Sequence, residues 1–318
     1  MKKLLFLLLL AMGAAAFLYL KANEIINTPQ KVDGERIVQI KSGDSLLTIA
    51  DSFYQQKLIK EKWHFVLYAK INKLYPQVKA GEYLINKDIN IVELGNLITS
   101  GKAYLRKITF AEGLTSREIM DILFNNSYLY GDFNPFAEGY ILPETYTFSR
   151  GDERQKIVNQ AHDALNKTLQ QAWDERDDDL PLKNKEEMLV LASIVEKETG
   201  VASERPQVAS VFINRLRKGM LLQTDPTVIY ALTQGKTDLG RKLMLKDLEI
   251  DNPYNTYKYA GLPPTPICNP GKEAIMAVAH PDKTPYLYFV ASGNGGHNFA
   301  RTLAEHNENV RKWRSLKK

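Results

Sequence analysis

The hydrophobic pattern of the chain begins with an uninterrupted apolar segment at the N-terminus. Leu4–Leu20 carries no charge and lies between Lys3 and Lys21. As a helix, this segment would span roughly 26 Å at about 1.5 Å per residue, slightly less than the ~30 Å hydrocarbon core of a bilayer. Lys2 and Lys3 place the N-terminus on the cytoplasmic side by the positive-inside tendency. We therefore predict a single-pass transmembrane anchor over residues 1–21, with the rest of the chain outside the cytoplasm.

A cleaved signal peptide is the alternative interpretation of this segment. Gly13–Ala16 offers the small residues of a cleavage site. The apolar run continues beyond them through Phe17, Leu18 and Leu20, which is unusual for a cleavage region. The pattern therefore favours an uncleaved anchor, followed by a polar linker over residues 22–34.

The next segment, 35–100, has the pattern of a small module. Arg36–Ile40 alternates like a strand, Ser45 can cap a helix, Trp63–Leu74 has helical periodicity, and Gly81–Ile85 is a second strand. Its beginning, VQIKSGDSLLTIA, resembles the LysM-type carbohydrate-binding repeat. The same order of strand, turn and helix can also be purely structural, so glycan binding by this module is one of two open interpretations.

From residue 101 to residue 318, helical periodicity alternates with short β-type segments, which predicts a second domain of mixed α/β content. Strands are predicted over 106–110 and 286–290. Helices are predicted over 116–124, 154–173, 184–199, 272–279 and 302–314, and from a cap at Ser203 to a stop at Gly219. The fold class of the whole chain is therefore α+β.

The helix over 184–199 carries the candidate chemistry. Asn184 can cap it, with Glu187 completing a pair like a capping box, and Gly200 is placed as its stop. Glu196 emerges from an apolar run in the last turn, where apolar neighbours and the partial negative charge of the helix C-terminus both raise a carboxyl pKa. A raised pKa suits a general acid. Glu198 points about 160° away by helix geometry, and an ordinary solvated glutamate is the alternative interpretation of Glu196.

Composition narrows the possible functions of the chain. The net charge is +5 without a block of like charges, so we expect no nucleic-acid partner. Cys268 is the only cysteine, which excludes an intrachain disulfide and Cys-x-x-Cys metal sites. The spacing of His280, His297 and His306 matches no metal motif, and we expect neither a metal nor a cofactor. Most glycosidases use two carboxylates, so one prominent glutamate indicates a reaction in which the substrate supplies the nucleophile.

Several separated motifs resemble the YceG-like family of endolytic murein transglycosylases. They are EGYILPETYTF, SIVEKETGVASERPQVASVFINRLRKGMLLQTDPTVIYAL, YNTYKYAGLPPTPICNPG and AHPDKTPYLYFVASGNGGHNFARTLAEHN. The resemblance covers the chain from about Ile37 to the last helix and includes the anchor. Thr265 stands where glycine is common in the family, a departure that does not touch the candidate acid.

The resemblance implies cleavage of peptidoglycan glycan strands at the outer face of a bacterial inner membrane, held through residues 4–20. The MurNAc-GlcNAc β-1,4 bond would break without water. Glu196 would protonate the leaving oxygen and then accept the proton of the MurNAc 6-hydroxyl, which yields a 1,6-anhydro end and can terminate strand elongation. Peptidoglycan synthases are implied partners. A non-catalytic peptidoglycan-binding scaffold of the cell-wall synthesis machinery is the alternative function.

The resemblance also implies substrate-binding residues in the catalytic domain, 101–318. They are Gln223, Thr224 and Asp225 in one loop, Asn255, Tyr257, Gly261 and Pro263 in a second wall, and His297 and Asn298 near the C-terminus. The two C-terminal residues either bind glycan or peptide or brace a turn. We expect Asp225 to cap the short helix that follows, because Pro226 stands at a first-turn position. Asp225 is then not a second catalytic carboxylate.

Overall fold

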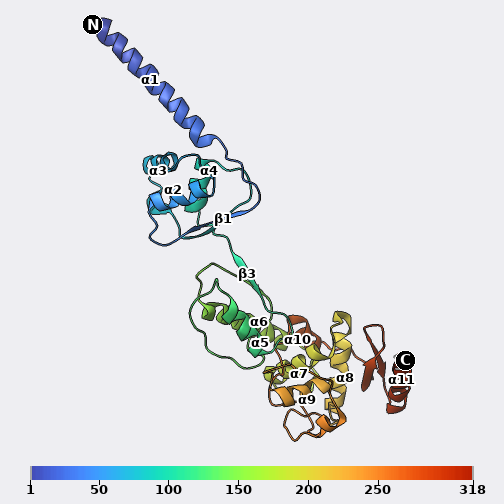
Figure 1. The fold of residues 1–318 in the computed structure, drawn as a ribbon. Coiled ribbons are helices and arrows are strands. Elements are labelled where there is room, and N and C mark those ends of the chain that lie inside the picture. Colours follow the sequence, from blue (N-terminus) through green and yellow to red (C-terminus); the bar gives the residue numbers. More distant parts are fainter. Residues whose placement is uncertain (1, 317–318) are drawn as a thin grey trace. The chain divides into compact units, whose positions relative to one another are not determined.

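The structure is a computed structural model and describes residues 2–316. The chain divides into two compact units, Met1–Arg106 with Thr147–Arg150, and Lys107–Tyr146 with Gly151–Lys318. The mixed α+β content predicted from the sequence is confirmed (Figure 1). All three sheets of the described residues have only two strands.

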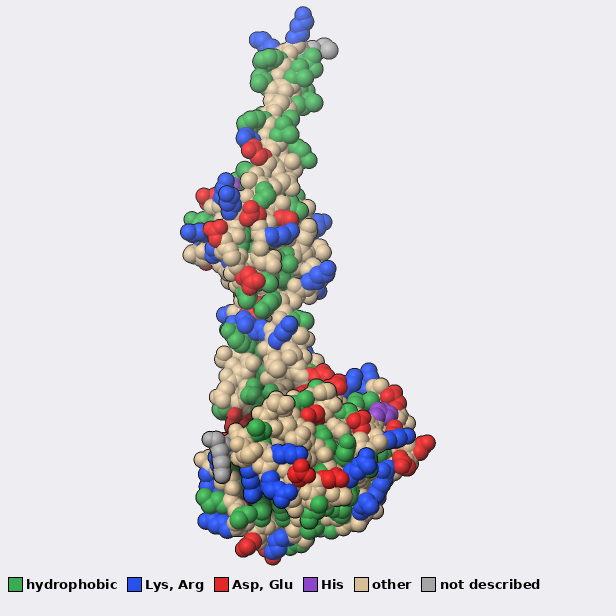
Figure 2. Space-filling model, turned by 90° about the vertical axis from the view of Figure 1, so that its right-hand side faces the viewer, with side chains coloured by type: hydrophobic (Ala, Val, Ile, Leu, Met, Phe, Trp, Pro, Cys, Tyr) green, Lys and Arg blue, Asp and Glu red, His purple; other side chains and the backbone are tan. Residues whose placement is uncertain are grey.

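The first unit begins with α1 (Lys2–Asn27), a long helix with no buried residue. Within residues 2–316, α1 alone is long and apolar enough to cross a bilayer. Hydrophobic side chains are exposed along α1 between the lysines of its first turn and Lys21 (Figure 2). A helix whose apolar residues 4–20 are all exposed indicates a membrane or signal segment rather than a core helix.

The rest of the first unit is a small module around one hydrophobic core. Its strands, β1 (Arg36–Ile40) and β2 (Gly81–Ile85), pair antiparallel. Its helices are α2 (Leu46–Gln55), α3 (Lys62–Ile71) and α4 (Ile91–Thr99). The order of strand, helix, helix and strand agrees with the sequence pattern, and the Ser45 hydroxyl accepts a hydrogen bond from Thr48 N at the start of α2, as predicted. The sequence analysis did not anticipate α4, which begins with an Asn90–Glu93 capping box.

The second unit is mainly helical. Its helices are α5 (Ser116–Asn125), α6 (Arg154–Glu175), α7 (Lys185–Glu198), α8 (Arg205–Arg217), α9 (Asp225–Thr233), α10 (Lys272–Ala279) and α11 (Leu303–Ser315). β5 (Tyr288–Ala291) and β6 (His297–Ala300) form an antiparallel hairpin. β3 (Arg106–Thr109) pairs with β4 (Thr145–Phe148), at the two points where the chain passes from one unit to the other.

α7 is the central helix of the second unit. It packs against α6, α8, α9 and α10 (Figure 1). Every residue from Met188 to Val195 is buried, because this stretch is apolar on all sides and is surrounded by other helices. The burial of the preceding turns holds the last turn of α7, with its two glutamates, in one position.

One predicted helix start is wrong. α8 begins at Arg205 after a short 3₁₀ turn over Ala202–Glu204, so Glu204 and not Ser203 occupies the N-cap position. The Glu204 side chain does not cap the helix, because its carboxylate accepts hydrogen bonds from His297 instead. A distant contact has replaced the local one that the sequence favoured.

Candidate active site

The ends of α7 are those predicted from the sequence. The Asn184 side chain accepts a hydrogen bond from Glu187 N at 2.8 Å. The Glu187 carboxylate accepts one from Lys183 N at 2.8 Å, so the reciprocal bond of a capping box is made one residue earlier than expected. At the other end, Thr199 is the C-cap and Gly200 is the first residue beyond it. This helix end presents Glu196 and Glu198 to two different surroundings.

Glu196 joins three parts of the unit. Its side chain is only 5% exposed, and its Oε1 accepts a hydrogen bond from Arg205 Nη2 at 3.1 Å. Its Oε2 accepts one from Gly271 N at 2.8 Å. Burial raises the pKa of Glu196 above its ordinary value and the negative charge of Glu112 acts in the same direction, although the Gly271 hydrogen bond and the Arg205 charge oppose this shift. Both carboxylate oxygens are therefore already engaged inside the protein, next to a guanidinium that favours the charged form.

Glu198 faces a cavity of about 190 Å³ instead. The cavity is lined by Glu198, Arg215, Gln223, Asp225, Tyr257 and apolar side chains. Burial raises the pKa of Glu198 to about 7, and the nearby negative charge of Asp225 acts in the same direction. The Thr224 hydroxyl donates a hydrogen bond to Glu198 Oε1 and opposes this shift. A carboxyl group that holds its proton near neutral pH and borders a polar cavity has the properties of a general acid.

The two glutamates lie on opposite sides of α7, as the helix geometry predicts from the sequence. Residues two apart on a helix point to opposite sides. What the periodicity did not reveal is that the side of Glu198 is covered by loop residues from distant parts of the chain. Glu198 therefore lines this cavity and Glu196 does not, while the choice of Glu196 as the reacting carboxyl group stays a prediction from the sequence.

The two loops predicted to form walls of the site are bonded to each other. Gln223 N donates to Thr256 O at 3.1 Å, and Thr224 N donates to Thr256 Oγ1 at 3.1 Å. Gln223 has a φ of +48°, a left-handed conformation that turns the chain at the entrance to α9. These bonds bring the loop that contains Gln223, Thr224 and Asp225 against the loop around Tyr257.

Asp225 differs from its prediction as a helix cap. α9 begins at Asp225, and Thr224 holds the N-cap position without a side-chain cap bond. Asp225 Oδ1 instead accepts a hydrogen bond from the Tyr257 hydroxyl at 2.6 Å. Burial, followed by this contact, raises the pKa of Tyr257, so the hydroxyl keeps its proton and remains a donor. Asp225 is therefore fixed as part of the cavity wall.

Asn255 is a structural residue of the second wall. It is fully buried, and its amide donates to Leu248 O and Ile250 O, both at 2.8 Å. Its Oδ1 accepts from Tyr257 N at 3.0 Å. Asn255 therefore fixes the backbone that presents the Tyr257 side chain to the cavity.

The remaining predicted binding residues are not among those that line the Glu198 cavity in the described structure. Gly261 has a φ of +87° in a loop, Pro263 is buried, and Asn298 lies exposed on β6.

His297 is hydrogen-bonded to the Glu204 carboxylate. Its backbone N lies 2.9 Å from Glu204 Oε1, and its Nδ1 lies 2.7 Å from Glu204 Oε2. His297 lies close enough to Glu198 to lower its pKa. It therefore braces the start of β6 beside the cavity, which is one of the two roles predicted for it.

Arg215 is a cavity residue that the sequence analysis missed. Its guanidinium donates to Leu287 O and to Leu222 O, both at 2.7 Å. It also lies over the Tyr288 ring at 5.2 Å. The available signal was its position on the inward face of α8, three residues after Phe212, where a charged residue is rare unless it has partners. Arg215 ties α8 to the loop before α9 and to β5.

Comparison with known proteins assigns the chain to a family. The sequence profile of the YceG-like family matches residues 38–312. The chain belongs to the YceG-like family. A relative from Bacillus subtilis, an endolytic murein transglycosylase, is 35% identical over 95% of this chain and 91% of its own length. An endolytic murein transglycosylase of Streptococcus pneumoniae is 28% identical over 86% of this chain and 57% of its own length.

A solved structure agrees with the family assignment. The crystal structure of a YceG-like protein from Listeria monocytogenes is 32% identical, with a TM-score of 0.53. The match covers 87% of this chain and 99% of that one. YceG-like membership therefore extends over both units and includes the helix end that carries Glu196 and Glu198. Within residues 2–316, no group of three His, Cys, Asp or Glu side chains is placed to hold a metal ion.

Proposed function

We propose that this YceG-like protein is a membrane-anchored endolytic transglycosylase of peptidoglycan in which Glu198 is both the acid and the base. The observation that carries the assignment is the Glu198 carboxyl group, whose pKa of about 7 accompanies its position on a polar cavity. The named activity of its relatives supplies the substrate class.

The reaction needs one carboxyl group and no water. Glu198 protonates the oxygen between MurNAc C1 and GlcNAc C4, the C1–O bond breaks, and the GlcNAc hydroxyl leaves. The Glu198 carboxylate then accepts the proton of the MurNAc 6-hydroxyl while that oxygen bonds to C1. The products are a 1,6-anhydroMurNAc end and a free GlcNAc end, and Glu198 is protonated again. A group with a pKa near neutrality can perform both proton transfers.

Asp225 and Tyr257 support Glu198 in this proposal. The Asp225 charge raises the pKa of Glu198 and can stabilise the positive charge that develops at C1. The Tyr257 hydroxyl holds Asp225 in place. Asp225 is also the carboxylate that a hydrolytic mechanism would use, since hydrolysis with inversion needs a second carboxylate about 6.5–9.5 Å from the acid.

The reaction is tested with the full chain, purified glycan strands and ¹⁸O-labelled water. We expect unlabelled products with 1,6-anhydro ends by mass spectrometry. Label at the new sugar end would make the protein a hydrolase and would assign a catalytic role to Asp225. Absence of any cleavage by folded protein would instead support the scaffold alternative.

The proposed location follows from α1. With Lys2 and Lys3 in the cytoplasm and α1 across the inner membrane, the second unit lies outside the cytoplasm, where nascent glycan strands are made. Cleavage there would terminate strand elongation beside a peptidoglycan synthase. The module over residues 35–100 is proposed to bind glycan through its LysM-like segment and so to retain the strand.

A further inference from the structure

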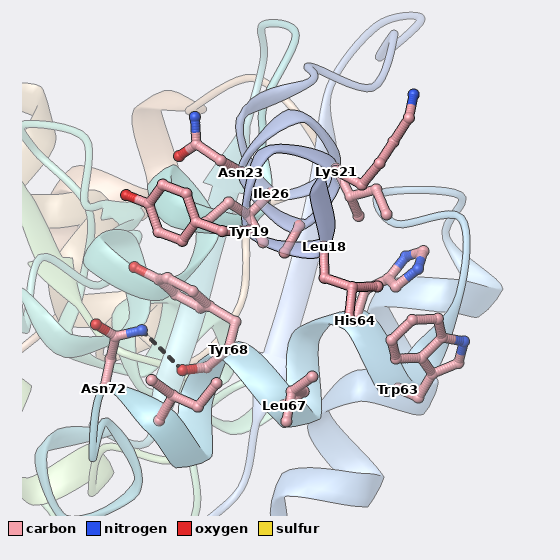
Figure 3. A pocket seen from close by; sticks show the side chains of 13 residues that line it. Leu18, Tyr19, Lys21, Asn23, Ile26, Trp63, His64, Leu67, Tyr68 and Asn72 are labelled. Carbon is pink, nitrogen blue, oxygen red and sulfur yellow. Dashed lines mark hydrogen bonds between the residues drawn. The ribbon is translucent and has the colours of Figure 1, made fainter. Parts of the chain in front are cut away.

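An apolar pocket lies between the end of α1 and helix α3 in the first unit. Its volume is about 550 Å³. Figure 3 shows Leu18 and Tyr19 of α1 on one side and Leu67 and Tyr68 of α3 on the other. Nothing in the proposed reaction uses this pocket, because its residues belong to the anchor and the module.

α3 is apolar on two sides, which is unusual for a short helix on a protein surface. Phe65 and Ala69 are buried in the core of the module. Trp63, Leu67 and Ile71 follow each other at intervals of four, so they form a stripe on another side, and they are 58%, 49% and 70% exposed. An exposed apolar stripe continuous with an apolar pocket marks a binding surface.

The position of this stripe identifies its occupant. The pocket is shared with Leu18 and Tyr19, which are among the last three residues of the apolar segment before Lys21. α3 therefore lies beside the point where the anchor leaves the hydrocarbon core. Tryptophan and tyrosine are enriched at this depth of a membrane, and Trp63 and Tyr19 both line the pocket.

The charges around the stripe fit a phospholipid surface. By helix geometry Lys70 shares the face of Trp63, seven residues earlier, and it is exposed. Lys21 lines the pocket, and its ammonium group is also paired with Glu24 at 2.8 Å on the exposed side of α1. Long lysine side chains at this level can place their ammonium groups among lipid phosphates while their methylene chains cover apolar surface.

We propose that α3 lies in the outer leaflet of the membrane and that the pocket between α1 and α3 takes an acyl chain of a phospholipid. The inference rests on α1 as a membrane anchor, which is part of the proposed function, and not on the reaction. With α3 in the outer leaflet, the module would form a second membrane contact beside α1 and would be restrained at the bilayer surface.

The full chain in vesicles of phosphatidylcholine and phosphatidylglycerol tests the proposal. With dibrominated acyl chains in the phosphatidylcholine, we expect quenching of tryptophan fluorescence that Trp63→Phe reduces several-fold. Trp313→Phe, the same substitution in the second unit, should not reduce it. An equal quenched fraction in wild type and Trp63→Phe, or the same loss in both variants, overturns the proposal.

A photo-crosslinking residue at Leu67 identifies the occupant in cells. We expect adducts of lipid mass on the full-length protein. Adducts only with another protein, or with a second copy of this chain, overturn the lipid assignment. Resistance to carbonate extraction reports on the anchor and anhydro product reports on the reaction, so a failure of the proposed function is distinguished from a failure of the lipid contact.

Discussion

Glu196 and Glu198 lie in the same helical turn, and their surroundings give them different chemistry. Glu196 has an arginine and a backbone N–H on its two oxygens. Glu198 has one hydroxyl donor, a neighbouring carboxylate and a cavity. Burial raises the pKa of both carboxyl groups, to about 7 for Glu198, and of the two only Glu198 lines the cavity.

Replacing each glutamate separately tests this difference. Glu198→Gln should lower turnover by about 10²–10⁴-fold, because the amide cannot transfer the proton. Glu196→Gln should keep measurable turnover but destabilise the fold by roughly 2 kcal/mol, since a charged hydrogen bond to Arg205 is weakened. Product formation and denaturant unfolding measure the two effects. The opposite result, loss of activity only in folded Glu196→Gln, would restore the sequence-based choice.

The raised pKa of Glu198 also predicts how stability depends on pH. Its folded-state pKa of about 7 exceeds the ordinary value of 4.5 for a glutamate, so the folded protein binds the extra proton. The associated stability is complete below pH 4.5 and is lost as the pH rises through 7. Glu198→Gln should therefore unfold at the same denaturant concentration as wild type at pH 4.5, and be more stable by about 1–3 kcal/mol at pH 8. Equal stability at both pH values would contradict the assigned pKa.

Thr224 lowers the pH up to which Glu198 stays protonated. Its hydroxyl donates to Glu198 and lowers the pKa of that group. Thr224→Val has nearly the same shape without the donor, so the alkaline limb of the pH–rate profile should move up by about one unit. A profile that keeps its midpoint while the rate falls would show that Thr224 acts only through packing.

At the scale of elements, two of the family motifs meet at Gly139. Its φ is +69°, and an added Cβ would lie 2.6 Å from Pro266 Cγ and 3.2 Å from Leu189 Cδ2. The segment around residue 139 therefore packs directly on the proline-rich loop and on α7. Two motifs that are distant in sequence therefore contact each other in the fold.

Alanine at Gly139 measures this contact. Gly139→Ala should destabilise the second unit by about 3 kcal/mol, the sum of left-handed strain and overpacking. Gly151→Ala is the matched control, because Gly151 has a φ of +82° with nothing within 4 Å of the added Cβ, and it should cost only about 1 kcal/mol. If urea unfolding gives the same loss of stability for Gly139→Ala and Gly151→Ala, the loop that contains Pro266 moves aside to accept the added Cβ.

At the scale of the whole molecule, the proposed location depends on whether α1 is kept as an anchor or removed as a signal peptide. Protein extracted from membranes should have its N-terminus at or near Met1, because the apolar segment continues past the small residues of Gly13–Ala16. N-terminal sequencing or intact mass measures this. A start between Ala15 and Lys21 would show a cleaved signal peptide, and the membrane contact proposed for α3 would then lose its basis.

The sequence by itself determined the family and most of the helices with their ends, although not α4. Asn184 and Ser45 cap as predicted because an N-cap bond joins residues two or three apart in the chain, so local sequence is sufficient. The order of strand, helix, helix and strand in the module follows from periodicity for the same reason. The family motifs also named the loops around Gln223 and Tyr257 that border the cavity.

Only the tertiary structure decided which glutamate faces that cavity. Residues 196 and 198 differ by about half a turn of one helix. The surroundings of Glu198 come from residues 222–225 and 257, whereas Glu196 contacts Arg205 and Gly271. The same reason explains Asp225, whose carboxylate bonds Tyr257 rather than its own helix, and Glu204, which bonds His297. Local rules assign a polar side chain to the nearest backbone, and a folded chain offers it partners that the local sequence does not contain.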